Sequence, residues 1–379
     1  MTPTDLIGPA SSLGSPAPYW FLVFFKVLGF ILHMIPMSLW YAGILLALLL
    51  RWRGGEFGRL WSARLMKQMP LWVALGVNFG IVPLLFTQVS YYQVFYPATI
   101  LMAWFWFSVI LLLTLAYYGV YIYAYGLKEG QTLTPFRRVA GWISAIFFIA
   151  IGFLFSNAFS LMTNLGGWPA LAEKTGYAGA VFGTALNTAD ATLWPRWLMF
   201  FGLALTTTGA YAFVDAGVFA RKESDAYRRT WAGSFALKIY TLGMLWFAFF
   251  GSWYVFGTWP TEIRLVMFAM PLGILTVLTG VSPGLVWVCL WLFRKSVGKG
   301  TALLVALAQF VVLALNAVSR QIVQNLELKK FLDITAEPVK IQLSPIILFL
   351  LLFVFGVAVV VWMVRKIIAV EGKPAAAGS

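Results

Sequence analysis

Long apolar segments separated by short polar stretches dominate the chain. Each is about twenty residues or longer, which is the length that an α-helix needs to cross the hydrocarbon core of a bilayer. The pattern predicts nine membrane-spanning helices, over Trp20 to Leu50, Pro70 to Tyr91, Ala98 to Gly126, Val139 to Met162, Trp194 to Ala220, Phe235 to Gly257, Leu265 to Phe293, Thr301 to Val323 and Pro345 to Ile368.

Basic residues concentrate in alternate loops. Loops one, three, five and seven and the C-terminal stretch carry Arg51, Arg53, Arg59, Arg64, Lys67, Lys128, Arg137, Arg138, Arg221, Lys222, Arg228, Arg229, Arg294, Lys295, Lys299, Arg365, Lys366 and Lys373. The even loops are poor in basic residues or mix them with acids, as at Glu327 and Lys329. Because cytoplasmic loops are enriched in Lys and Arg, the odd loops and the C-terminus are expected to be cytoplasmic and the N-terminus outside.

The expected fold is therefore all-α: a polytopic integral membrane bundle of nine transmembrane helices. We divide the chain into three parts. Residues 1–19 form an extracytoplasmic N-terminal segment, residues 20–368 form the membrane domain, and residues 369–379 form a flexible cytoplasmic tail.

Composition agrees with this assignment and narrows the chemistry. Hydrophobic residues make up 61% of the 379 residues and charged residues only 11%, against about 25% charged residues in soluble domains. The net charge of +14 is accounted for by the cytoplasmic loops, so it does not indicate a nucleic-acid partner. Cys289 is the only cysteine, which excludes an intrachain disulfide, and one Cys with one His does not suit a zinc site.

Polar groups inside a bilayer are costly, so each one in a predicted span is a hypothesis. Lys26 lies in the outer turns of the first span, and we expect its amine to extend outward to the interface. Asp215 lies near the inner end of the fifth span, where we expect a local ion pair with Arg221 and Lys222.

His33, the only histidine, lies in the outer half or near the middle of the first span. One interpretation is a neutral imidazole that hydrogen-bonds across helices. The other is an axial haem ligand, which needs an imidazole nitrogen on a rigid helix facing apolar walls. Pro36 removes the backbone bond to the carbonyl of Leu32, which predicts a kink beside His33. Methionines such as Met199 are usually packing residues that could also serve as soft axial ligands.

The order of these segments resembles subunit I of the cytochrome bd quinol oxidases. That family has nine spans, with the N-terminus outside and the C-terminus inside. It also has a haem-ligand His near a Pro in the first span and an Arg-Gln pair late in the chain on the outer side. The stretches that are similar here are LHMIPMSLWYAGILLALLL, MPLWVALGVNFGIVPLLF, GFLFSNAFSLMTN, PRWLMFFGLALTTTGAYAF and VSRQIVQN, the last containing Arg320 and Gln321.

The chain also departs from the family. Pro36 lies three residues after His33 rather than five, so aligning the prolines puts the ligand position at Ile31. The fifth-span His that binds the family's low-spin haem falls near Met199. The two glutamates of the family's third span fall on apolar or aromatic positions in PATILMAWFWFSVILL, and its long quinol-binding loop is reduced to GTWPTEIR.

The resemblance implies a membrane-integral electron-transfer subunit without oxygen reduction, in a bacterial or archaeal cytoplasmic (inner) membrane. Haem b would be bound at His33, with Met199 as a weaker axial candidate. Arg320 and Gln321 would contact a haem propionate or a quinone. Electrons would pass between quinone and a periplasmic cytochrome or partner subunit, so any enzymatic role would be as a quinol-linked oxidoreductase subunit.

Two other classes of function stay open from the residues alone. The first is a haem-free membrane anchor or scaffold subunit of a redox complex, which the missing ligands favour. The second is a small-solute transporter, with which the proline-interrupted spans and Asn78 and Asn157 are compatible.

Overall fold

The computed structural model describes residues 2–128, 133–220 and 222–371. Within these ranges, nine helices are long and apolar enough to cross a membrane, which confirms the predicted helical bundle and its nine candidate spans. Most of the predicted flexible tail, from residue 372 onward, lies outside the described residues.

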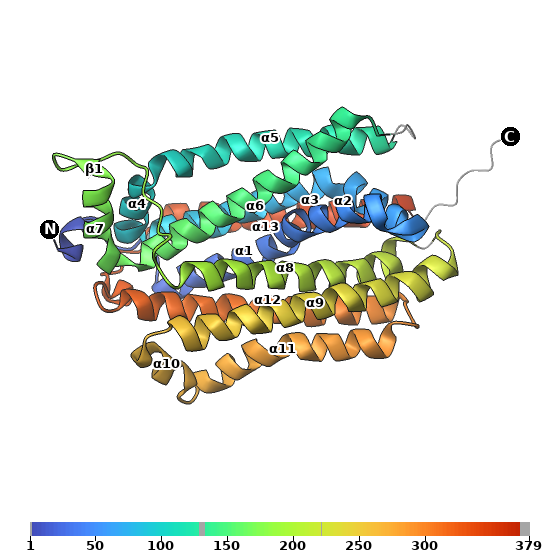
Figure 1. Cartoon of the computed structure of the whole chain (residues 1–379). Helices are drawn as coiled ribbons and strands as arrows, with labels where there is room; N and C mark the ends of the chain where they lie inside the picture. The colour runs from blue at the N-terminus through green and yellow to red at the C-terminus, as the bar shows by residue number, and fades with distance from the viewer. Residues whose placement is uncertain (1, 129–132, 221, 372–379) are drawn as a thin grey trace.

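The candidate spans lie roughly parallel to one another in one elongated bundle (Figure 1). The first runs through α1 (Tyr19–Ser38), a π-helical turn (Leu39–Gly43) and α2 (Ile44–Arg53). The other spans are α3 (Gly55–Ser90), α5 (Ala103–Lys128), α6 (Pro135–Thr163), α8 (Leu193–Val214, extended by a π-helical turn over Asp215–Phe219), α9 (Gly233–Ser252, with π-helical turns over Ala226–Ala232 and Trp253–Thr258), α11 (Leu272–Phe293), α12 (Lys299–Leu328) and α13 (Leu343–Glu371).

The remaining elements are short. They are α4 (Tyr92–Leu101), α7 (Trp168–Lys174), α10 (Thr261–Phe268), 3₁₀ turns over Pro3–Leu6, Leu165–Gly167 and Ile334–Ala336, and the antiparallel strands β1 (Gly176–Tyr177) and β2 (Ala180–Val181).

The N-terminal segment, α4, α7 and α10 lie at one end of the bundle, which we call the N-terminal face (Figure 1). The connection from α12 to α13 also lies there, because Val339 pairs with Ser15 of the N-terminal segment. The same segment contacts α4, where the Gly8 N–H donates to the carbonyl of Gln93. The turns from α2 to α3 and from α8 to α9, which carry predicted cytoplasmic charges, lie at the opposite face (Figure 1). This alternation is the one that the charge pattern requires.

Three predicted boundaries differ from the observed ones. The basic loop before Pro70 is largely helical, because α3 already begins at Gly55. The predicted third span is divided into α4 and α5. The predicted seventh span is divided into α10 and α11 around Pro271, since proline removes a backbone donor and disfavours helix in the preceding residue.

Helix α8 is the most buried candidate span, and α13 is the least buried. Small residues let α8 approach α9 closely: a Cβ atom on Gly202 would lie 2.6 Å from the Phe247 nitrogen. Helix α13 instead contacts the bundle through aromatic pairs, with Phe349 and Phe353 packed edge-on against Phe25. The core therefore forms around α8, and α13 covers its edge.

The helix that carries His33 stays helical through Pro36 and widens one turn later, over Leu39–Gly43. The predicted disturbance thus takes the form of a π-helical turn, a feature that is frequent at functional sites.

Candidate functional site

His33 projects from α1 against α3. Its Nδ1 lies 2.7 Å from the carbonyl oxygen of Gly76. Because a carbonyl can only accept, Nδ1 carries the hydrogen and the neutral ring keeps its lone pair on Nε2. Within the described residues, Nε2 has no hydrogen-bond partner, and it is not fully enclosed. The arrangement fixes one tautomer and leaves the other nitrogen available.

Two glycines on α3 make room for this contact. A Cβ atom on Gly80 would lie 2.8 Å from Nδ1 of His33, and one on Gly76 would lie 2.3 Å from the Trp40 ring. Trp40 in turn meets the imidazole edge-on, with ring centroids 5.8 Å apart. Small residues spaced four apart allow close helix packing in membranes. The two glycines are visible in the sequence as GVNFG, but they were not predicted to form the contact surface for His33.

Met199 lies at another helix interface. Its sulfur would be 3.6 Å from a Cβ atom on Gly251 of α9, and the side chain packs against both the main core cluster and the cluster that contains Tyr254 and Trp259. His33 packs on α3 instead. The two candidate axial ligands therefore line different contacts of the bundle.

Arg320, on α12, points into a cage of three phenyl rings. The guanidinium carbon lies 4.6 Å from the ring centroid of Phe30, 4.8 Å from that of Phe159 and 5.8 Å from that of Phe200. Cation–π contacts of this kind stabilise a desolvated guanidinium. Among the described residues, no carboxylate lies within ion-pair distance of it.

Gln321 faces a different group. Its Nε2 donates to the hydroxyl of Tyr91 at 2.5 Å and to Oδ1 of Asn325 at 3.2 Å. The Tyr91 hydroxyl also lies 3.1 Å from that of Tyr19. Arg320 and Gln321, predicted to act together, are thus directed to separate surroundings.

Lys26 does not extend outward as expected. It is only 5% exposed, and Nζ lies 4.0 Å from the centroid of the Tyr91 ring. Its amine approaches Oε1 of Gln324 at 3.4 Å, a long hydrogen bond. The other amide atom of Gln324, Nε2, is buried without a partner in the described part of the chain. The prediction that the amine reaches water is wrong, because Tyr91, just after α3, and Gln324 of α12 enclose it.

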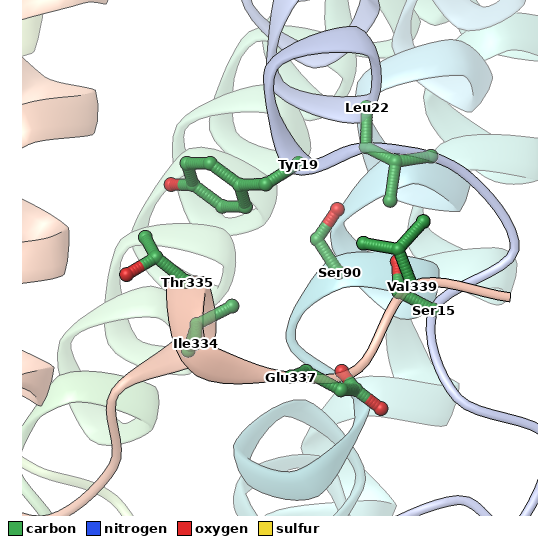
Figure 2. A pocket seen from close by; sticks show the side chains of 8 residues that line it. All are labelled: Ser15, Tyr19, Leu22, Ser90, Ile334, Thr335, Glu337 and Val339. Carbon is green, nitrogen blue, oxygen red and sulfur yellow. The ribbon is translucent and has the colours of Figure 1, made fainter.

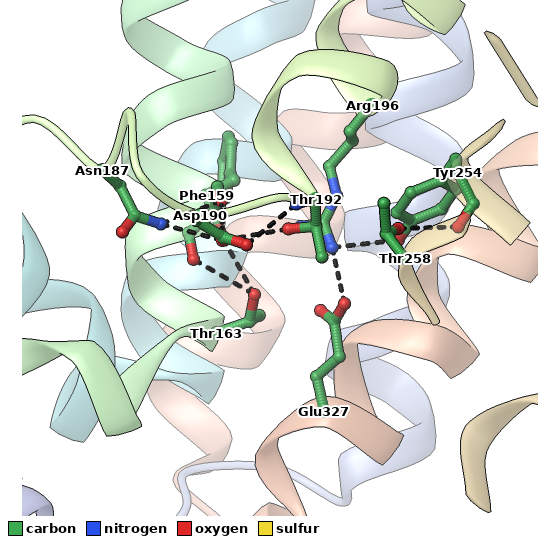
Figure 3. A network of polar contacts seen from close by, with 10 residues as sticks. Phe159, Thr163, Asn187, Asp190, Thr192, Arg196, Tyr254, Thr258 and Glu327 are labelled. Carbon is green, nitrogen blue, oxygen red and sulfur yellow. Dashed lines mark hydrogen bonds and ion pairs between the residues drawn. The ribbon is translucent and has the colours of Figure 1, made fainter. Parts of the chain in front are cut away.

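Arg196, at the start of α8, forms the centre of a second polar network (Figure 3). Its Nη2 donates to Oε1 of Glu327 at 2.5 Å and to the hydroxyl of Tyr254 at 2.9 Å. Nearby, Asp190 accepts hydrogen bonds from Ser160 and from other side chains of the loop before α8. Sequence reasoning placed Glu327 in a loop, but α12 extends one residue beyond it.

At the opposite face, Asp215 pairs with a distant helix. Its two carboxylate oxygens each accept from Arg64 of α3 at 2.9 Å, a bidentate pair that Glu223 extends at 3.2 Å. The expected local partner Arg221 lies outside the described residues. The ion pair lies near the inner end of the fifth span, as predicted, and the partner described here, Arg64, comes from the second span.

A small cavity lies at the N-terminal face beside Tyr19 (Figure 2). Its volume is about 20 Å³ and its lining includes Tyr19, Ser90 and Glu337, so it has room for about one water molecule. The hydroxyl of Ser90 is buried there without a partner among the described side chains. Leu22, one helical turn before Lys26, also lines the cavity.

No group of three or more His, Cys, Asp or Glu side chains that could hold a metal ion occurs in the ranges that the structure describes. Comparison with known protein families finds no match to this chain, and comparison with curated proteins finds none either.

Proposed function

We propose that the chain is a membrane-integral electron-transfer subunit that binds a b-type haem through His33. It would pass electrons between quinone and a periplasmic or partner redox protein, without oxygen reduction. The observation that carries the proposal is the hydrogen bond from Nδ1 of His33 to the carbonyl of Gly76. Metal-ligating histidines commonly donate their other ring N–H to a carbonyl or carboxylate, which fixes the tautomer and ring orientation.

The surroundings of Arg320 suit the polar edge of such a group. A haem offers carboxylate propionates, and Arg320 is a caged cation without a carboxylate partner in the described residues. A guanidinium binds a carboxylate bidentately through two parallel hydrogen bonds. Phe30, one turn before His33 on α1, links the two positions, because its ring packs on Arg320.

The chain's own residues would each have one task. Gly76 and Trp40 hold the imidazole in place, and Arg320 neutralises a propionate or polarises a quinone oxygen. A bound b-type haem would supply a one-electron redox centre. In the predicted orientation, this site belongs to the extracytoplasmic half of the membrane domain.

An optical spectrum tests the proposal. The purified protein should show a reduced-minus-oxidised difference spectrum of the b type, and His33→Ala should abolish or alter it. Met199→Leu should leave the spectrum unchanged if Met199 is a packing residue and shift it if Met199 is an axial ligand. Asn78→Ala is a matched control, since Asn78 lies on α3 between the two glycines but is exposed and bonds only to its own helix.

The second candidate is a haem-free anchor subunit, and the packing of the same histidine favours it. The imidazole already joins α1 to α3 through Gly76 and rests on the backbone of Gly80. A purely structural histidine would tolerate His33→Gln, whose amide can still donate to the Gly76 carbonyl. Co-purification with cytochrome subunits, together with no haem in this chain, would support this candidate.

A further inference from the structure

Cationic side chains at the helix contacts of this protein differ in whether a carboxylate neutralises them. Arg64 and Arg196 each have a carboxylate within 3 Å, from Asp215 and Glu327 respectively. Lys26 and Arg320 have none among the residues that the structure describes. An uncompensated cation inside a membrane protein is expensive, and such residues usually face a partner or a functional pathway.

The two uncompensated cations lie on one contact surface. Lys26 and Phe30 are one turn apart on α1, and Arg320 and Gln324 are one turn apart on α12. The two pairs contact each other across the helices: Lys26 bonds to Gln324, and the ring of Phe30 packs on Arg320.

A third group at this surface lacks an acceptor. Gln324 is 5% exposed, and its Oε1 is taken by Lys26 while its Nε2 has no partner in the described chain. A buried donor without an acceptor costs free energy and calls for an explanation. An ammonium, a guanidinium and an amide N–H are all hydrogen-bond donors. A group that only accepts hydrogen bonds and carries negative charge would complement all three.

We propose that Lys26, Arg320 and the Nε2 group of Gln324 form a binding site for a carboxylate anion at the α1–α12 interface. The carboxylate neutralises part of the paired positive charge and accepts the hydrogen bonds that the protein leaves unmade.

The inference deepens the proposed function, on which it rests only for the source of the carboxylate. A haem propionate and a free small carboxylate share the same chemistry. The test therefore uses sodium acetate as the probe and compares wild-type protein with His33→Gln, which lacks the imidazole. Haem content is read separately, from the absorbance of the same samples.

The measurement is the thermal midpoint of the full-length protein in an uncharged detergent. Sodium acetate should raise the midpoint of His33→Gln saturably, by about 2–5 °C over sodium chloride of equal ionic strength. Combining Lys26→Met with Arg320→Gln should remove this rise. Lys329→Met should keep it, because Lys329 is an exposed lysine just past the end of α12.

The outcome in the wild-type protein identifies the source. A haem-loaded wild type that ignores acetate while His33→Gln responds indicates a propionate already in the site, and a response in both indicates a free carboxylate. If His33→Gln does not fold and the wild type is haem-free, the wild type takes its place in the acetate titration. If the wild type holds haem, the test is whether the Lys26→Met/Arg320→Gln protein loses that haem, as the carboxylate site requires. A haem-free protein that shows no saturable rise, or an equal rise in the double variant, overturns the proposal. Loss of haem chemistry alone would not.

Discussion

The charge of Arg196 is neutralised by a carboxylate, unlike the charges of Lys26 and Arg320 within the described residues. The Arg196–Glu327 pair is shielded, with side chains 10% and 13% exposed, and Tyr254 adds a further bond. One oxygen of Glu327 nevertheless has no partner among the described residues. A pair buried to this degree depends on both members, because removing one leaves an uncompensated charge.

Glu327→Gln should therefore lower the free energy of unfolding by about 3–5 kcal/mol. The double variant Arg196→Met/Glu327→Leu should lose clearly less, because it leaves no charge behind. Glu262→Gln serves as the control, since Glu262 is exposed on α10. Thermal or denaturant unfolding in detergent measures all three, and equal losses in the single and double variants would contradict the buried-pair interpretation.

Some functional candidates could be predicted from the sequence, but the contacts that their side chains make could not. His33 could be singled out because it is the only imidazole. The burial of Lys26 could not be predicted, because Tyr91 and Gln324, which enclose it, are far away in the sequence. The different contacts of Arg320 and Gln321 likewise depend on distant residues, which for Arg320 are rings from α1, α6 and α8.

At the scale of elements, the contact between α1 and α3 determines how His33 is held. Gly76 and Gly80 bring the two helices close enough for the imidazole to reach a backbone carbonyl. A methyl group at either position would force Trp40 or His33 to move.

Gly76→Ala should lower the free energy of unfolding by about 1–3 kcal/mol, the usual cost of overpacking. Gly280→Ala is the matched control, because nothing lies within 4 Å of a Cβ atom there and alanine is the better helix former. The thermal midpoint of Gly76→Ala should fall, while that of Gly280→Ala should rise or stay unchanged. A Gly76→Ala protein as stable as the wild type would contradict the packing described here.

Helix existence could be read from apolar length, but the helix ends could not. The basic stretch before Pro70 is polar and still helical, because Trp61, Leu65 and Met66 are buried in the core. Such burial on one side of a charged helix is set by the neighbouring helices. Pro271, by contrast, was a local signal that could have divided the predicted seventh span in advance.

Within the described residues, nine candidate spans place the N-terminal segment and the last turn of α13 at opposite faces. The N-terminal segment meets the connection from α12 to α13, and α13 then runs to the other face. With the positive-inside rule, the C-terminus should be cytoplasmic.

A fluorescent protein fused to the C-terminus should therefore fluoresce in cells, while alkaline phosphatase fused there should be inactive. A phosphatase placed in the loop between α6 and α8, such as after Gly179, should be active, because that loop lies at the N-terminal face. The reverse pattern would invert the orientation and put the His33 site in the cytoplasmic half.

Haem binding at His33 can be tested with a pyridine haemochrome assay. The assay should find haem b in the purified, folded wild-type protein. His33→Gln should stay folded, since its amide can keep the contact with Gly76, and should lose the haem or show an altered spectrum. A folded wild-type protein without any haem would contradict the claim.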